Sequence, residues 1–238
     1  MAEREFKHLE LHQAFIQARL VHGYRFLDLS GAVLNRIGDF YEEKGIDPGG
    51  GLLRGRRDIR DPYSIRFSPE NIWLQYAPVE SLEYVIDTAP EWITSIARDI
   101  EVKSFRTLGF RTLYFITSEN IIKSSARLAR KFSGDILREV ITEVGKERDV
   151  GFSYMVRIPV KQYIAVIRIN SVRIVRPAIE TIDYPSHGSI FDVDIYWRRE
   201  GSDSIPRAET KGFLKSASDI IYDLLNKMGC KHMEGEDG

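Results

Sequence analysis

The chain has 238 residues, 43% hydrophobic and 29% charged, so it can bury the core of one large domain or of two packed halves. This balance argues against disordered and fibrous proteins. The formal net charge is −1, so affinity for nucleic acid would require a local basic patch rather than an overall basic field.

The cysteine and hydropathy patterns predict a cytoplasmic protein. Cys230 is the only cysteine and lies in a polar tail, so no internal disulfide or CxxC zinc site can form. The N-terminal residues include acids and lack an apolar run, and no segment approaches the roughly 18 to 20 apolar residues of a membrane span. We therefore expect neither a signal peptide nor contact with a membrane.

The first half predicts a strand, a helix, two short strands and a broken helix. The helix is expected to begin after Ser30, a plausible cap, and to end before Gly45. Residues 63–76 predict two short strands joined by a turn. Residues 81–100 have helical spacing, but Pro90 interrupts them, so we expect a broken helix or a helix pair.

The second half begins with another long strand and continues with a helix, several strands and a final helix. Apolar residues recur at helical spacing over 121–132, after which Gly134 ends the run. Residues 150–174 alternate and predict a long hairpin with Lys161 near its tip. Residues 190–199 predict a further strand, followed by an amphipathic helix that stops at Gly229.

The order of these elements suggests two related halves. Residues 23–25 (Gly-Tyr-Arg) and 109–111 (Gly-Phe-Arg) are each expected to end a strand that feeds a helix, although two such triplets could also match by chance. We predict an α+β fold in which two related strand–helix–strand halves, about 1–100 and 101–229, form a largely antiparallel sheet packed by amphipathic helices. The halves would form one globular domain, and residues 230–238 a disordered tail.

Part of the second half resembles an uncharacterised, sporadically distributed prokaryotic protein family, mainly over residues 100–228. The resemblance rests on an Arg-x-Gly-x-Arg-like signature in a long strand and on aspartates in a late strand. The matching positions are Arg106, Gly109, Arg111, Asp192 and Asp194. The aromatic residue that usually follows the second arginine is displaced to Tyr114, and the family's proline-rich N-terminal signature is absent. The resemblance implies an α+β fold and a prokaryotic accessory role, but no chemistry.

A glycine-rich segment at residues 45–62 is the most unusual stretch. Its spacing from Gly50 to Arg56 is formally that of a phosphate-binding loop, but the Lys and Ser or Thr of such loops are missing and no strand is expected before it. We predict instead either an arginine cluster for phosphate, RNA or an acidic partner, or a solvated loop. The cluster consists of Arg54, Arg56, Arg57 and Arg60.

A second basic feature follows one face of the helix over 121–132. It consists of Lys123, Arg127, Arg130 and Lys131, opposite the apolar stripe. Such a face can bind nucleic acid or simply be solvated.

Asp192 and Asp194 project from one face of a strand and could share a divalent cation. The further ligands this would require are Glu180, Asp183 and His187, which are near only in sequence. The alternative is pairing with Arg157 or Arg168 on an adjacent strand. No nucleophile motif and no other metal-ligand spacing stands out.

These observations rank three hypotheses. The first is a non-enzymatic binding or regulatory accessory protein without cofactor or metal, whose partner is a protein. By analogy with other sporadic prokaryotic families, we expect a setting in genome defence or signalling. The second is nucleic-acid binding through the glycine–arginine segment and the basic helix face. The third is a metal-dependent enzyme that uses Asp192 and Asp194.

Overall fold

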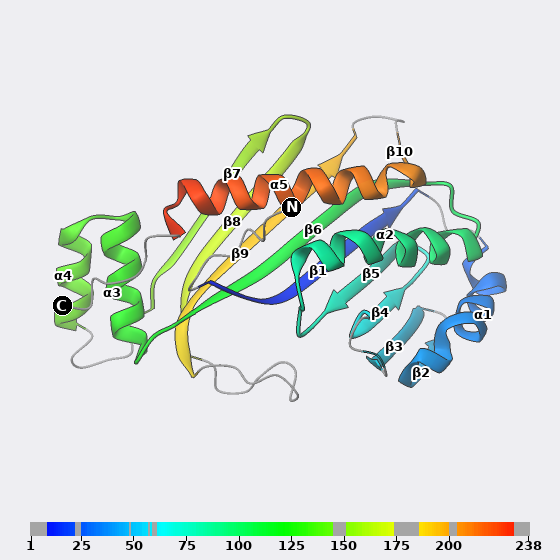
Figure 1. Ribbon diagram of the computed structural model, residues 1–238, viewed down its shortest axis with the longest axis horizontal. Helices are drawn as coiled ribbons and strands as arrows, with labels where there is room; N and C mark the ends of the chain where they lie inside the picture. Colours follow the sequence, from blue (N-terminus) through cyan, green and yellow to red (C-terminus); the bar gives the residue numbers. More distant parts are fainter. Residues whose placement is uncertain are drawn as a thin grey trace.

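A computed structural model shows one ten-stranded sheet with helices packed on one face (Figure 1). The structure describes residues 9–21, 25–47, 49–56, 58, 61–144, 151–173, 186–199 and 204–230. No helix within these residues is both long and apolar enough to cross a membrane.

The elements of the two halves follow one another along the chain. The first half contains β1 (Glu10–Leu20), α1 (Phe26–Ile37), η1 (Gly38–Phe40), β2 (Tyr41–Asp47), β3 (Gly50–Arg56), β4 (Ser64–Phe67), β5 (Asn71–Tyr76) and α2 (Leu82–Asp99). The second half contains β6 (Ser104–Thr117), α3 (Ile121–Phe132), α4 (Asp135–Val144), β7 (Ser153–Val160), β8 (Tyr163–Arg173), β9 (His187–Arg198), β10 (Ile205–Pro206), η2 (Arg207–Glu209) and α5 (Thr210–Lys227).

The sheet is antiparallel throughout its described pairs, in the order β2-β3-β4-β5-β1-β6-β9-β8-β7, with β10 on β6. The predicted α+β class and largely antiparallel sheet are therefore confirmed. The first strands of the two halves, β1 and β6, are neighbours at the centre. Outward from β1 lie β5, β4 and β3, and outward from β6 lie β9, β8 and β7. Each half ends in a long helix, α2 or α5, and these two lie side by side (Figure 1).

The two Gly-aromatic-Arg triplets do not occupy equivalent positions in the two halves. Arg25 follows the end of β1 and precedes α1, and the two residues before it lie outside the described part of the chain. Gly109, Phe110 and Arg111 instead lie in the middle of β6, which continues to Thr117. The expectation that both triplets end a strand is wrong for the second one, because β6 continues for six residues beyond Arg111. The halves correspond in strand order, and their origin by duplication stays a prediction.

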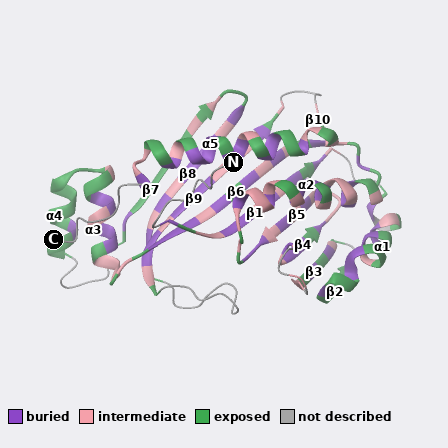
Figure 2. Cartoon of the chain, in the orientation of Figure 1, coloured by how far each residue is buried: buried purple, intermediate pink, exposed green. Residues whose placement is uncertain are grey.

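Side-chain alternation along the strands divides the sheet into a core face and an open face. In β1, Ala14, Ile16 and Ala18 are fully buried, whereas Phe15 and Gln17 between them are only partly buried. The buried set faces the helices, and Figure 2 shows the buried residues running along the central strands. Burying an isoleucine in this way stabilises the fold by about 1.5–3 kcal/mol.

Helix α2 is continuous, although Pro90 predicted a break. Its first turn is capped by Ser81, whose hydroxyl accepts the Tyr84 N–H at 3.1 Å, and it runs to Asp99 without interruption. Proline removes one backbone hydrogen bond, but Pro90 is itself buried, with Ala89 and Ile93 on the same packed side. Burial of this apolar face holds the helix together through the proline.

The glycine-rich segment is a hairpin, not a loop. Residues expected to be irregular form β2 and β3, which pair from Tyr41 with Arg56 to Asp47 with Gly50. The Asp47 carboxylate closes the turn by accepting the backbone N–H groups of Gly49 and Gly50 at 2.7 and 3.0 Å. The Phe67 ring lies where a side chain at Gly51 would be, so glycine here serves close packing.

Helix α1 begins at Phe26, one turn before the predicted cap Ser30, because the buried Phe26 ring extends the apolar stripe. Helix α3 lies as predicted, and its cap is Asn120, whose side-chain oxygen accepts the Lys123 N–H at 2.8 Å. Helix α4 has no counterpart in the sequence analysis. The short strands β4 and β5, the β7–β8 hairpin with Lys161 at its turn, the strand β9 and the helix α5 are all confirmed.

Buried serines join α3 to the sheet. The Ser124 hydroxyl lies 2.8 Å from that of Ser189 on β9. Ser125 donates to Ser171 on β8 at 2.6 Å. Ser171 also accepts the Phe152 N–H at 2.6 Å, so these polar groups satisfy one another. Small side chains at this contact let the helix lie close to the core face of β8 and β9.

Cys230 is buried, which corrects its assignment to a disordered tail. It is 1% exposed and belongs to the core, and burial raises the pKa of its thiol to about 12. We expect the folded protein to resist an aromatic disulfide reagent at mildly alkaline pH, because the reagent needs an accessible thiolate. The reaction should follow the unfolding curve in urea. A fast, stoichiometric reaction of the native protein would contradict this burial.

Candidate functional site

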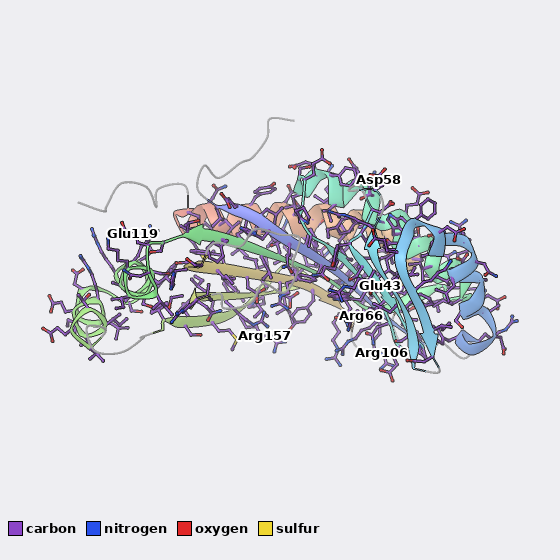
Figure 3. All side chains as sticks on the ribbon, turned by 90° about the horizontal axis from the view of Figure 1, so that it is seen from below. Glu43, Asp58, Arg66, Arg106, Glu119 and Arg157 are labelled. Carbon is purple, nitrogen blue, oxygen red and sulfur yellow. The ribbon has the colours of Figure 1, made fainter. Side chains whose placement is uncertain are left out.

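The sheet face opposite the helices is the most distinctive surface of the molecule. In the part of the chain that the structure describes, α1, α2, α3 and α5 pack on the core face, and α4 packs against α3. Seen along the sheet, Arg66, Arg106 and Arg157 project away from α2 and α5 (Figure 3). No helix among the described residues covers the other face, which we call the open face.

Arginines are concentrated on this open face. Strand parity and pairing place on it Arg19, Arg54, Arg66, Arg111, Arg157, Arg168 and Arg198. Arg106, at the register shift of β6, also lies on this face (Figure 3). The carboxylates that the same pairing places on this face are Glu10, Glu43, Asp47, Asp192 and Asp194. Because the whole chain has a net charge of −1, this distribution is a strong segregation of positive charge.

Aromatic rings lie between these arginines. The Arg66 guanidinium lies 5.7 Å from the ring centroid of Trp73, and Arg111 lies 5.7 Å from that of Phe15. Arg157 lies 5.7 Å from the Tyr196 ring. Phe15 and Trp73 also contact each other across β1 and β5, with centroids 5.4 Å apart. The open face thus combines cations with flat, partly exposed rings.

Asp192 joins two of the arginines. Arg111 donates from Nε and one terminal nitrogen to the two oxygens of Asp192, at 2.7 and 2.9 Å. Arg168 donates to one of the same oxygens at 3.2 Å. The Asp192 side chain is 5% exposed, whereas those of Arg111 and Arg168 are 46% and 36% exposed. A buried carboxylate therefore orients two guanidinium groups whose outer parts reach solvent.

The arginine partners of Asp192 weaken the hypothesis that Asp192 and Asp194 hold a metal ion. Arg168 pairs with Asp192, as the sequence alternative predicted, but Arg157 lies over Tyr196 instead. Both oxygens of Asp192 accept from guanidinium groups, and the described residues contain no group of three or more His, Cys, Asp or Glu side chains that could hold a metal ion. Glu180 and Asp183 lie outside the described residues.

A hollow of about 370 Å³ lies on the open face where β1, β6 and β9 meet. Its walls are polar and contain both cations and a carboxylate. It is lined by Gln17, Arg19, Arg106, Thr107, Gly109, Asp194, Tyr196 and Arg198. Asp194 is partly buried here, and burial together with the charge of Asp192 raises the pKa of its carboxyl group, against the effect of Arg111 and Arg168.

The predicted glycine–arginine cluster is divided by the structure. Arg54 faces the open side and lies over the Tyr63 ring at 5.9 Å. Arg56 instead donates to the backbone carbonyls of Asp61 and Pro78 at 2.7 and 3.1 Å, a structural role. Gly55 has a left-handed backbone (φ 72°), and Arg56 after it pairs in register with Tyr41, which is buried in the core. Arg57 and Arg60 lie outside the described residues.

The predicted basic helix face lies apart from the open-face arginines. Lys123, Arg127, Arg130 and Lys131 belong to α3, which packs on the core face of β8 and β9. Lys123 forms an ion pair with Glu119 one turn earlier. The two basic features proposed from sequence therefore do not combine into one surface. Of the open-face arginines, the sequence analysis predicted Arg54 as a binding residue and named Arg106, Arg111, Arg157 and Arg168 only in other roles. It missed Arg19, Arg66 and Arg198, although each occupies a polar position of an alternating strand.

Neither a scan against protein-family models nor a search of curated proteins finds a match to this chain. The resemblance to a prokaryotic accessory family therefore stays a prediction. Functional conclusions rest on the geometry of the open face.

Proposed function

We propose that this protein binds nucleic acid on the open face of its sheet and acts as a non-enzymatic binding protein. The observation that carries the proposal is the set of eight arginines on one uncovered face of a chain whose net charge is −1. Guanidinium groups match phosphate oxygens in geometry and charge, and the phosphate backbone supplies most of the affinity in such complexes.

The aromatic rings favour nucleic acid over an acidic protein. Phe15, Trp73 and Tyr196 lie among the arginines, and rings in this setting stack with bases. Large apolar side chains of the kind that form protein interfaces are mostly only partly exposed here, as for Leu113, Ile164 and Ile190. Of the exposed ones in the described chain, only Leu52 and Met155 belong to this face. The proposal thus replaces the expected protein partner by nucleic acid. It places the nucleic acid on the open face of the sheet and not on the glycine–arginine segment and the basic helix face.

Salt dependence and tryptophan fluorescence together test the proposal. We expect a labelled single-stranded oligonucleotide to bind at low salt, with an affinity that falls steeply and linearly on a log–log scale as salt rises. Binding should quench Trp73, which lies on the open face, and not Trp92, which contacts Phe40 and Tyr41 beside the helices. The quench should disappear in Trp73→Phe and persist in the matched variant Trp92→Phe.

Two results would overturn the proposal. The first is the absence of oligonucleotide binding at low salt. The second is a quench that Trp92→Phe removes and Trp73→Phe leaves intact, because the ligand would then lie against the helices.

A further inference from the structure

The hollow between β1, β6 and β9 has two chemically different ends. At one end, Arg19 pairs in register with Thr107 and Thr107 with Arg198, and Arg106 lies beside them. Two residues further along the strands, at about 6.6 Å per step, Gly109 forms the floor between Gln17 and Tyr196. One more step leads to Asp194, which pairs in register with Arg111, and the guanidinium group of Arg111 is hydrogen-bonded to Asp192. The lining of the hollow therefore has three arginines at one end and the Asp194 carboxyl group at the other, with Gly109 between them.

Neither end has a direct ion-pair or hydrogen-bond partner within the described chain, although the charges of Arg111 and Arg168 act on Asp194. Arg19, Arg106 and Arg198 form no ion pair or hydrogen bond through their guanidinium groups to other described residues. The same holds for the Asp194 carboxyl group, although it is partly buried. This differs from Asp192, whose two oxygens are both hydrogen-bonded to arginines. A bare phosphate would satisfy the cations and leave the carboxylate unpaired, which is costly once water is excluded.

The floor of the hollow is open because residue 109 has no side chain. A Cβ there would meet nothing closer than the Gln17 carbonyl oxygen at 3.9 Å, so packing within the protein does not require glycine. The hollow of about 370 Å³ lies at the small end of ligand sites, which span roughly 300–1,000 Å³. It therefore suits one nucleotide and is too small for a duplex.

We propose, building on the function proposed above, that the hollow holds one unpaired guanine nucleotide. Its phosphate lies at the end formed by Arg19, Arg106 and Arg198, and its base edge lies at Asp194. Guanine presents two adjacent N–H donors, N1–H and the 2-amino group, which a carboxylate accepts as a pair. In a duplex this edge is occupied by cytosine, so the nucleotide must be unpaired.

The test compares three short single-stranded oligonucleotides by fluorescence anisotropy: one without guanine, one with a single central guanine and one with inosine at that place. We expect the guanine strand to bind about tenfold more tightly than the guanine-free strand, as for one good bidentate base contact. Inosine lacks the 2-amino group and should lose most of the gain. Competition by guanosine monophosphate, but not adenosine monophosphate, would indicate a free nucleotide as ligand. Failure of both to compete would indicate a nucleotide within a strand.

The variants Asp194→Asn and Gly109→Leu should remove the preference for guanine and leave binding of the guanine-free strand at least as tight as before. The control Arg66→Ala lies on the open face outside the hollow and should weaken both strands equally. Equal binding of all three strands, or a preference that survives both hollow variants, would overturn the guanine site while nucleic-acid binding stands. Absence of binding to every strand would overturn both proposals.

Discussion

Replacing Asp192 by alanine is expected to lower the free energy of unfolding by about 2 kcal/mol, a large effect for a polar residue on a sheet surface. The change removes three hydrogen bonds to charged donors, two from Arg111 and one from Arg168. Removing one partner of a fully buried ion pair costs about 3–5 kcal/mol, and the loss is smaller here because water can reach both guanidinium groups. Urea denaturation of Asp192→Ala beside the unchanged protein measures this loss.

The matched control is Asp194→Asn, two residues along the same strand. The raised pKa of Asp194 means that ionisation of its carboxyl group is less favourable in the folded than in the unfolded protein, so the ionised form costs stability at neutral pH. A neutral amide removes that cost, and we expect unchanged or higher stability. If both variants lose stability equally, the arginine pairs of Asp192 are not the cause. Asp192→Ala should also bind nucleic acid more tightly, because Arg111 and Arg168 lose their internal carboxylate.

Much of the fold could be predicted because its signals are local. Alternation over β7, β8 and β9 identifies strands without knowledge of their partners. Helix α5 is likewise predictable from the spacing of its own apolar residues, and its end from Gly229, which has a left-handed backbone (φ 70°). The prediction was wrong where tertiary packing overrides the local preference of a proline or a glycine. Pro90 continues a helix because its whole face is buried, and three consecutive glycines form a hairpin because Phe67 and Asp47 hold them in place.

The candidate site could not be predicted because it depends on strand register. Alternation assigns Arg19 and Arg198 to the polar side of their own strands, but nothing local says that β6 lies between those strands. The pairing of Arg19 with Thr107 and of Thr107 with Arg198 brings together residues from opposite ends of the chain. Sequence reasoning instead favoured clusters of consecutive charges, such as residues 54–60. Consecutive strand residues point to opposite faces, so such a run cannot form one surface in a strand.

The largest functional effect is expected when three arginines of the open face, Arg66, Arg157 and Arg198, are replaced together by alanine. All three side chains are exposed and none forms an ion pair with another described residue, so the stability of the fold should change little. If each contacts one phosphate, the slope of log affinity against log salt for a single strand should fall by about two. At low salt the affinity should fall by about a hundredfold, since each solvent-exposed ion pair with phosphate contributes at most about 1 kcal/mol.

A triple variant on α3, with Lys123, Arg127 and Arg130 changed to alanine, removes the same charge from the other side of the molecule. It lowers the net charge of the protein equally, so a purely global electrostatic effect would weaken both variants alike. Binding through the open face requires instead that the α3 variant keep nearly the original affinity and salt slope. If the α3 variant loses binding and the open-face variant keeps it, nucleic acid binds along the helix that the sequence pattern favoured, and the arginines of the sheet are not the site.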